Sequence, residues 1–568
     1  MSTTSRGTRL TVIATRGPAF ALALAAALAI AMPAAAGQIA IPRVERMPNI
    51  PQPFAMKDWR AHAVAYDKFV FDFSLMGEHL PLVWIDNTKA NYDLPGFGLP
   101  TYVGSPKRGE GSHEGINCLG AVLGATLVGI DKSKGPINFV LACQRYFNKA
   151  NGQNVILNGT RAGTGGSFWY ELWPSILFFA LAERYPGTGE MDACVRTHAD
   201  RWAEACSVLA GGGDGAADFD HLAFDFKKMA ASDNGKHQEP EGAAGAAWIE
   251  YAAYAKWKDP KHLRAAESAV RFLQKRSGPV ANPYYEILLP WGALAAARLN
   301  AELGREYDVP RFVTWCFDGD RTPRGSWGVI ADRWGRYDAS GLVGSLTDTG
   351  GYGFAMNTFA QAGAMAPLVR YDNRFARAIG KYMLNAANAA RLFYADALPE
   401  ENQSSAFWKG DPRHVISYEG VRKTWEGKSP YATGDAVRGK WAATDFALYG
   451  GSYVGFFGGI IGRTEDEKIL RLDCLATDFY RDRAYPTYLY YNPYMQARQV
   501  TADVGGEPRD LYDAAADRFM ARGVTGKAAF TIPADSAVVL VIVPAGGKAT
   551  RDGRKLLVNG VVIDYSAP

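Results

Sequence analysis

Residues 235–255 read GKHQEPEGAAGAAWIEYAAYA, a polar run that turns abruptly into a stretch rich in glycine and alanine. Pro240 has a fixed φ and no N–H group, so it suits the first turn of a helix. The carboxylates of Glu239 and Glu241 would then lie at the helix N-terminus, where the macrodipole favours negative charge. The rest of the stretch is nearly uncharged, so we expect this helix to be buried on all sides.

The same unit recurs along the chain: a glycine-rich polar loop, a small-residue helix, then an amphipathic helix. A helix that is apolar all round is buried, whereas a helix with one apolar face lies at the surface. The buried helices are predicted at 114–130, 168–183, 241–256, 284–299, 351–368 and 446–461. The surface helices are predicted at 138–149, 190–208, 261–275, 305–316, 373–391 and 464–482.

Six buried helices alternating with six surface helices predict a mainly α fold, an (α/α)6 toroid, over residues 57–495. Glycine and alanine allow the inner helices to approach closely, although each interior glycine costs about 0.5–1 kcal/mol relative to alanine. The intervals between the predicted inner helices vary widely. An irregular all-α array or a helical solenoid is therefore the alternative architecture.

The last part of the chain changes to a β pattern. Residues 539–543 are a β-branched apolar run, and Asp552-Gly553 and Asn559-Gly560 are strong hairpin-turn signals. We expect a small antiparallel, sandwich-like β-domain over residues 496–568.

The N-terminal region has the pattern of a secretory signal peptide. Arg6, Arg9 and Arg16 precede an apolar run at 19–32, which is followed by the small residues of 33–37. The run is shorter than the ~20 residues that a membrane span requires, although an uncleaved anchor is the alternative. The sequence thus predicts a signal peptide at 1–36, a proline-rich linker at 37–56, and export to the periplasm or the extracellular space.

The composition excludes some classes of function. The net charge is only +4, which argues against nucleic acid as the main partner. Aromatic residues reach 12% of the chain, as in a large core or a sugar-binding cleft. The 6 cysteines form no C-x-x-C pair, so we expect buried thiols rather than a disulfide framework or a metal site. No metal or cofactor is predicted.

The candidate catalytic residues lie in the loops that enter the predicted inner helices, which would converge at one end of a toroid. Glu241 is the first candidate, because the neighbouring Glu239 could raise its pKa by like-charge repulsion. Asp348 would face it across the ring, and two such carboxylates would serve as acid and base in inverting glycoside hydrolysis. The rival chemistry is proton abstraction α to a uronate carboxyl group by one of three bases, His113, His237 or Tyr284.

Polar and aromatic side chains of the same loops are expected to bind the substrate, namely Glu114, Arg161, Trp169, Tyr170, Tyr285, Tyr352 and Asp435. Two long insertions at 317–347 and 396–445 add Trp327, Arg333 and Trp408. Flat aromatic rings pack against sugar rings, and arginine can pair with a uronate carboxylate in a bidentate manner. The alternative is that the carboxylates cap helices and that the tryptophans anchor the insertions.

Four blocks complete the pattern: SHEGIN at 112–117, HQEPEGAAG at 237–245, TDTGGYGFA at 347–355 and YPTYLYYNPY at 485–494. With the signal peptide, the alternating helices and the β-domain, the chain resembles bacterial secreted (α/α)6-toroid carbohydrate-active enzymes. These include glucuronidase-type glycoside hydrolases and heparinase- or alginate-lyase-like polysaccharide lyases. The resemblance implies an oligo- or polysaccharide substrate.

The leading prediction is an exported glycoside hydrolase that acts on an acidic, uronate-containing glycan. Two alternatives stay open: a polysaccharide lyase that uses a His or Tyr base, and a non-catalytic glycan-binding protein of the cell envelope.

Overall fold

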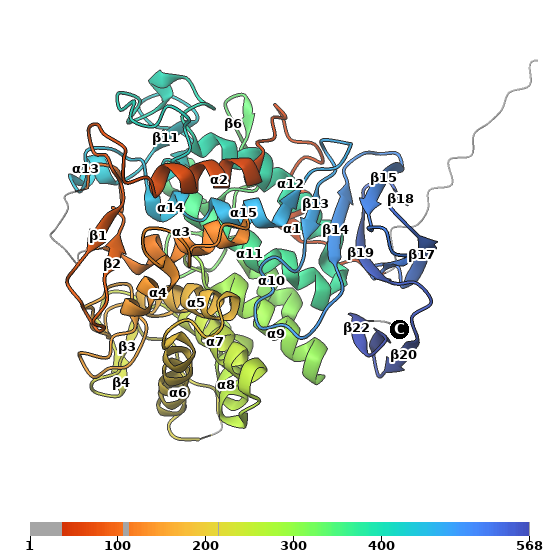
Figure 1. Cartoon of the computed structure of the whole chain (residues 1–568), viewed down its shortest axis with the longest axis horizontal. Helices are drawn as coiled ribbons and strands as arrows, with labels where there is room; N and C mark the ends of the chain where they lie inside the picture. The colour runs from red at the N-terminus through yellow and green to blue at the C-terminus, as the bar shows by residue number, and fades with distance from the viewer. Residues whose placement is uncertain (1–36, 106–112, 214, 567–568) are drawn as a thin grey trace, which may run out of the picture. The chain divides into compact units, whose positions relative to one another are not determined.

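The computed structural model describes residues 37–105, 113–213 and 215–566 (Figure 1). The predicted signal peptide at 1–36 lies outside them. Within these ranges, no helix combines the length and the apolar character that a membrane span requires. The six cysteines are buried free thiols.

Six helices that are buried along most of their length lie where the sequence predicts the inner helices. They are α3 (Gly115–Leu127), α5 (Phe168–Arg184), α7 (Gly242–Trp257), α9 (Leu289–Leu303), α11 (Ala355–Tyr371) and α15 (Val454–Ile460). Each packs against the next in this order, and α15 packs against α3. This closed succession is consistent with the inner ring of a toroid. We refer to these six as the inner helices.

Five further helices each follow one of the first five inner helices and pack against it. They are α4 (Phe139–Cys143), α6 (Met191–Leu209), α8 (Pro260–Lys275), α10 (Val309–Asp318) and α12 (Ala376–Ala389). The last of them is buried at every position except Arg377, so the surface helix predicted at 373–391 is a buried helix. The predicted sixth, at 464–482, is wrong. There Leu470, Leu472 and Cys474 are buried while Arg471 and Asp473 are not, which is the two-residue period of a strand. Instead, α2 (Trp59–Val70), from the beginning of the described chain, packs against α15.

Glycine sets the spacing between two pairs of inner helices. A Cβ atom added to Gly455 of α15 would lie 2.2 Å from the Cα atom of Gly124 in α3. A Cβ atom added to Gly292 of α9 would lie 2.7 Å from the Cα atom of Ala244 in α7. Any side chain at these positions would push the backbones apart, so the small-residue composition is a packing requirement.

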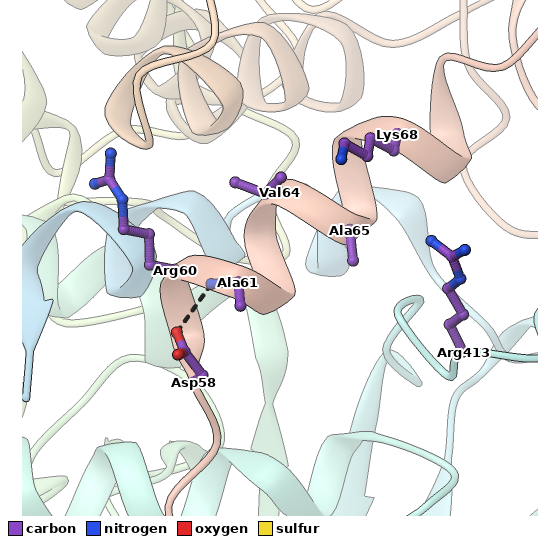
Figure 2. A pocket seen from close by; sticks show the side chains of 7 residues that line it. All are labelled: Asp58, Arg60, Ala61, Val64, Ala65, Lys68 and Arg413. Atoms are coloured by element: carbon purple, nitrogen blue, oxygen red, sulfur yellow. Dashed lines mark hydrogen bonds between the residues drawn. The ribbon is translucent and has the colours of Figure 1, made fainter.

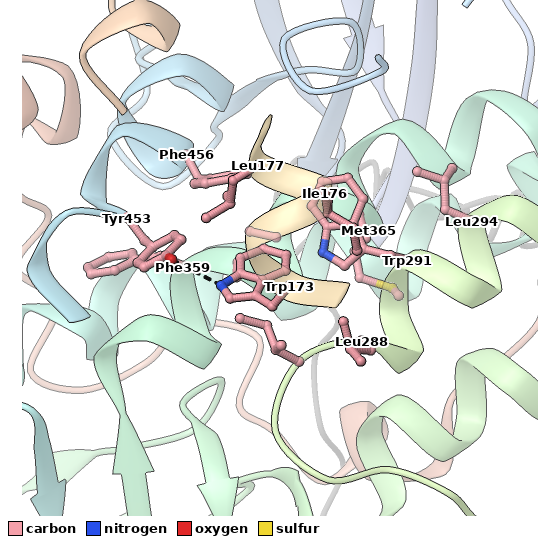
Figure 3. Close-up of a cluster of buried hydrophobic side chains, with 14 of the residues drawn as sticks. Trp173, Ile176, Leu177, Leu288, Trp291, Leu294, Phe359, Met365, Tyr453 and Phe456 are labelled. Carbon is pink, nitrogen blue, oxygen red and sulfur yellow. Dashed lines mark hydrogen bonds between the residues drawn. The ribbon is translucent and has the colours of Figure 1, made fainter. Parts of the chain in front are cut away.

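Large aromatic side chains fill the space between the inner helices (Figure 3). Trp173 of α5 and Trp291 of α9 are fully buried, with ring centroids 6.0 Å apart. The indole Nε1 atom of Trp173 donates a hydrogen bond of 3.0 Å to the Tyr453 hydroxyl, which donates to the carbonyl of Ile116 over 2.9 Å. The space between these inner helices is therefore a packed core.

The C-terminal part contains an antiparallel six-stranded sheet in the order β12-β13-β14-β19-β16-β17. Its strands are β12 (Ile461–Gly462), β13 (Arg471–Asp473), β14 (Thr487–Asn492), β16 (Arg509–Asp513), β17 (Arg518–Val524) and β19 (Ser536–Pro544). Helix α12 packs against β14 and β19. Three strands of this sheet precede residue 496, so the β-rich region begins earlier in the chain than the predicted boundary.

Smaller strand groups complete this region. Strand β15 (Arg498–Asp503) pairs with β18 (Lys527–Ile532). A three-stranded sheet consists of β20 (Ala549–Asp552), β21 (Lys555–Val558) and β22 (Val561–Asp564), whose two turns are those that the sequence predicts.

The two long insertions do not form isolated loops. Together with residues 352–354 they build a five-stranded sheet of β5 (Trp327–Val329), β8 (Val343–Ser345), β9 (Tyr352–Phe354), β10 (Gly420–Arg422) and β11 (Tyr431–Thr433). Strand β9 leads directly into α11, so this sheet lies at the N-terminal end of an inner helix.

The remaining elements are short. The helices are α1 (Pro42–Glu45), α13 (Ala436–Gly439) and α14 (Leu448–Gly451). The strands are β1 (Trp84–Asp86), β2 (Gly96–Gly98), β3 (Ala223–Asp225), β4 (Ala230–Ser232), β6 (Arg333–Trp334) and β7 (Tyr337–Asp338).

Candidate active site

Three carboxylates gather at the N-terminal ends of the inner helices. Glu114 immediately precedes α3, Glu239 lies just before α7, and Glu286 lies just before α9. Tyr170 lies in the first turn of α5. Burial and the negative charges of these three carboxylates raise the pKa of its hydroxyl group. The Tyr170 side chain is nevertheless 45% exposed. We call Glu114, Glu239, Glu286 and Tyr170 the carboxylate cluster.

Glu286 has the environment of a general acid. Burial raises its pKa to about 7, a hydrogen bond from Tyr285 and the charge of Arg324 oppose that rise, and the charge of Glu239 adds to it. Its side chain is only partly buried, so a substrate could contact it. A carboxyl group with a pKa near neutrality can be protonated at working pH and still release its proton.

The backbone at Glu286 is held in an uncommon conformation. Its φ is 77°, in the left-handed region that is rare for residues other than glycine. Its carbonyl accepts a hydrogen bond of 2.6 Å from the Nδ2 atom of Asn357, a buried residue of α11. Backbone strain of this kind often occurs at functional sites, where the surrounding structure fixes one orientation.

The side chain of Arg324, whose charge lowers the pKa of Glu286, packs against a series of aromatic rings. The guanidinium of Arg324 lies over the ring of Tyr285, 3.5 Å from its centroid. Tyr285 packs edge-on against Trp327 at 5.3 Å, and Trp327 stacks on Phe354 at 5.1 Å. Of the two residues predicted to bind sugar here, Tyr285 is part-buried, whereas Trp327 is buried and supports it.

Glu239 is oriented by the start of α5. Its Oε2 atom accepts hydrogen bonds from the Ser167 hydroxyl at 2.7 Å and from the backbone N–H of Trp169 at 3.1 Å. Its Oε1 atom lies 3.9 Å from Nε2 of His237, which is part-buried. The indole N–H of Trp169 is buried and has no hydrogen-bond partner within the described chain. Ser167 and Trp169 thus fix one oxygen of Glu239, whose side chain is 5% exposed.

Glu241, the first catalytic candidate from the sequence, has a different environment. Its side chain is 2% exposed, and its Oε1 atom accepts a hydrogen bond of 2.7 Å from the backbone N–H of Leu289. Burial raises its pKa, and the charges of Glu286 and Glu239 add to the rise. In this position Glu241 caps the N-terminus of α9, which is the capping alternative that the sequence left open.

Asp348, the second candidate, belongs to a separate group of charges on the five-stranded sheet. Buried Arg422 donates to Asp348 over 2.7 Å and to Asp435 over 3.0 Å, and it lies over the ring of Tyr352 at 3.6 Å. The sequence placed Asp348, Tyr352 and Asp435 in the site, and the structure does bring these three together. We call them and Arg422 the Arg422 group.

Glu419 adjoins the Arg422 group and was not predicted. Burial raises its pKa to about 7, a hydrogen bond from the Tyr449 hydroxyl opposes that rise, and the charge of Asp435 adds to it. Its Oε2 atom accepts from the backbone N–H of Asp435 at 2.6 Å. Glu419 is a lone carboxylate in a long insertion, where no periodic pattern distinguishes it.

Two of the three predicted bases are buried. His113 bonds Asp86 at 2.8 Å and the Tyr146 hydroxyl at 2.6 Å. Although burial favours its neutral form, the bond to Asp86 raises the pKa of His113 to about 9, so it is a cation at neutral pH. Tyr284 is inaccessible to solvent and donates to Gln361 over 2.7 Å. Of the three, only His237 is part-buried rather than buried, and its Nε2 atom lies 3.9 Å from Glu239.

Three other predicted substrate-binding residues have no recorded contact with the carboxylate cluster. Arg161 is exposed. Arg333 is exposed in β6 and donates to the carbonyl of Arg336 over 3.2 Å. Trp408 is buried, donates to the carbonyl of Glu78 over 3.2 Å and packs against Phe446. Trp408 thus anchors its insertion, as the alternative interpretation held.

Two cavities differ in their relation to the cluster. One of about 410 Å³ lies beside α2 and is lined by side chains that include Arg60, Lys68 and Arg413 (Figure 2). The larger, of about 910 Å³, is lined by His237 and Pro323, which are close neighbours in sequence of Glu239 and Arg324. Only the larger cavity borders the carboxylate cluster through these neighbours, and we call it the His237 cleft.

Comparison with known proteins adds little. No protein-family model matches the sequence, and no curated protein matches it either. Among solved structures, a GH127 β-L-arabinofuranosidase from Geobacillus stearothermophilus T6 aligns with 68% of this chain and 80% of its own, at 10% identity and a TM-score of 0.23. A likeness at this level carries no argument about fold or chemistry.

Proposed function

We propose that the protein is a glycoside hydrolase, that its inner and outer helices form an (α/α)6 toroid, and that the carboxylate cluster is its active site. The observation that carries the proposal is the pair Glu286 and Glu239. Glu286 is part-buried with a pKa of about 7, and its neighbour Glu239 raises that pKa. A carboxyl group with a raised pKa beside a second carboxyl group is the arrangement that acid and base roles require.

In this proposal Glu286 is the general acid. In its protonated form it donates a proton to the oxygen of the glycosidic bond as that bond breaks, so the leaving sugar departs as a neutral alcohol. The strained backbone of Glu286 and its hydrogen bond from Asn357 hold the carboxyl group in place. Arg324 stabilises the carboxylate that is left after proton transfer.

Glu239 is the second carboxylate. The Ser167 hydroxyl and the Trp169 backbone N–H both donate to its Oε2 atom, and neither donates to Oε1. Oε1 would act on the anomeric side, either by activating a water molecule or by attacking the anomeric carbon directly, according to the separation of the two carboxylates. Tyr170, half exposed between the carboxylates, would contact the sugar ring.

Elimination is the weaker candidate. A lyase needs a base that can remove a carbon-bound proton at neutral pH. His113 is protonated, Tyr284 is buried, and the pKa of Tyr170 is raised rather than lowered, so none of the three suits that task. His237, whose Nε2 atom lies 3.9 Å from Glu239, is the candidate base that remains.

We propose, as the sequence predicts, that the substrate is a uronate-containing glycan outside the cytoplasm. The test is incubation of the purified protein with a panel of neutral and uronate polysaccharides. New reducing ends without conjugated-uronate absorbance are expected and indicate hydrolysis. The appearance of that absorbance would instead indicate a lyase, and binding without any product would indicate a glycan-binding protein.

A further inference from the structure

The His237 cleft has a distinct position and size. Its lining comes from the segment 233–240 that leads into α7 and from the C-terminal end of α8 with residues 276–280. Its volume of about 910 Å³ lies within the range of ligand pockets, about 300–1,000 Å³. It adjoins the carboxylate cluster, because His237 lies 3.9 Å from Glu239 and Pro323 precedes Arg324.

The carboxylates that line this cleft have ion-pair partners, whereas two of its lysines have none in the part of the chain that the structure describes. Both of its carboxylates have partners: Asp220 pairs with Arg276, and Asp233 pairs with His221 at 2.8 Å. The exposed side chains of Lys236 and Lys275 have no ion-pair partner among the described residues. The cleft lining therefore includes two ammonium groups without an ion-pair partner among the described residues, one from each of these segments.

The carboxylate cluster carries negative charge, in contrast to the lysines of the cleft. Glu114, Glu239 and Glu286 all act on Tyr170, whereas Arg324 is the cation that acts on Glu286. A sugar with its own carboxylate, bound at the cleaved linkage, would meet like charges there. A neutral sugar would not.

Building on the proposed hydrolase function, we infer that the His237 cleft binds the carboxylate of a uronic acid unit of the glycan, at least one sugar away from the linkage that is cleaved. Lys236 and Lys275 pair with that carboxylate, and the sugar at Glu286 and Glu239 is uncharged. The uronate selects the substrate by binding and takes no part in bond cleavage.

Calorimetric titration tests the cleft directly, with disaccharides in which galacturonic, glucuronic or mannuronic acid is joined to one neutral sugar. Their carboxyl-reduced forms serve as neutral comparisons. We expect at least one acidic disaccharide to bind, and K236Q/K275Q to weaken that binding at least tenfold. K527Q/K548Q is the control, because it removes the same charge from exposed lysines of the C-terminal β region. The inference is overturned if no uronate binds, if the reduced form binds equally well, or if the cleft lysines do not matter.

The cleft and the catalytic proposal can fail separately. If uronate binding depends on the two lysines but no glycan is hydrolysed, the inference about the cleft stands and the proposed hydrolase function is overturned. If the protein hydrolyses an acidic glycan and K236Q/K275Q has the same KM as the wild type, the hydrolase function stands and the inference about the cleft is overturned. If both proposals hold, the double variant raises KM for acidic substrates, leaves kcat unchanged and does not alter KM for carboxyl-reduced substrates.

Discussion

The carboxyl group of Glu286 is controlled by neighbours from several parts of the chain. Burial sets its pKa near 7, while Tyr285 and Arg324 lower that pKa and Glu239 raises it. Since the proposed role of Glu286 requires its protonated form, activity should fall as the pH rises through this pKa. Replacing any one of these neighbours should therefore shift the pH at which activity falls on the alkaline side of the pH profile.

Removing the cation near Glu286 should move that limb in a defined direction. Arg324 favours ionised Glu286, so Arg324→Gln raises the pKa of Glu286 and keeps the acid protonated to higher pH. We expect the alkaline limb of kcat/KM to shift upward by roughly one pH unit. Arg554→Gln, an exposed position in the β region, is the control. A limb that stays in place or moves to lower pH would show that Glu286 is not the group that the profile reports.

Part of the site could be predicted from the sequence. The rule that loops before inner helices carry the polar groups identified Glu114, Glu239, Tyr170 and Tyr285. The same rule selected Tyr284 and Tyr285 and passed over the next residue, Glu286. What distinguishes Glu286 is its burial and the charges of Arg324 and Glu239, and these come from tertiary contacts that no local pattern shows.

At the scale of elements, backbone contact between inner helices makes glycine necessary. Gly455→Ala would place a methyl group 2.2 Å from the Cα atom of Gly124, where no flexible side chain can move away. We expect a loss of about 1–3 kcal/mol in the free energy of unfolding, measured by urea denaturation. Gly506→Ala, where the added methyl meets open space, should change it little. Equal stability of the two variants would contradict close packing of α3 and α15.

Of the twelve helices predicted from the helical period of the sequence, eleven correspond to helices of the structure, and the one at 464–482 does not. Charged and apolar residues there fit a helical face as well as a strand, and the choice depends on Leu472 pairing with Leu489 in the sheet. The pairing of β9 with β10, in the second insertion, joins residues that are still farther apart in the sequence. No local pattern specifies such partners, so the sheet that carries the Arg422 group could not be predicted.

At the scale of the whole molecule, the helical and β-rich parts share structure. Strand β14 pairs with β19 along its full length, and α12 packs against both. A chain ended after residue 495 would keep β14 and lose β19, which exposes the buried side chains of Leu489 and Tyr490. We expect this truncated chain to be insoluble or to lack a cooperative thermal transition. A soluble truncation with the thermal transition and activity of the full chain would show that residues 496–568 are an independent domain.

The central claim is that Glu286 delivers the proton in glycoside hydrolysis. It is tested most directly by the kcat of Glu286→Gln on the best substrate of the polysaccharide panel, with Glu306→Gln as control. Glu306 is exposed just beyond the opposite end of α9. We predict that Glu286→Gln lowers kcat by about 10²–10⁴-fold while the thermal transition is retained, and that the control keeps its activity. Near-wild-type turnover by a folded Glu286→Gln variant would contradict the account.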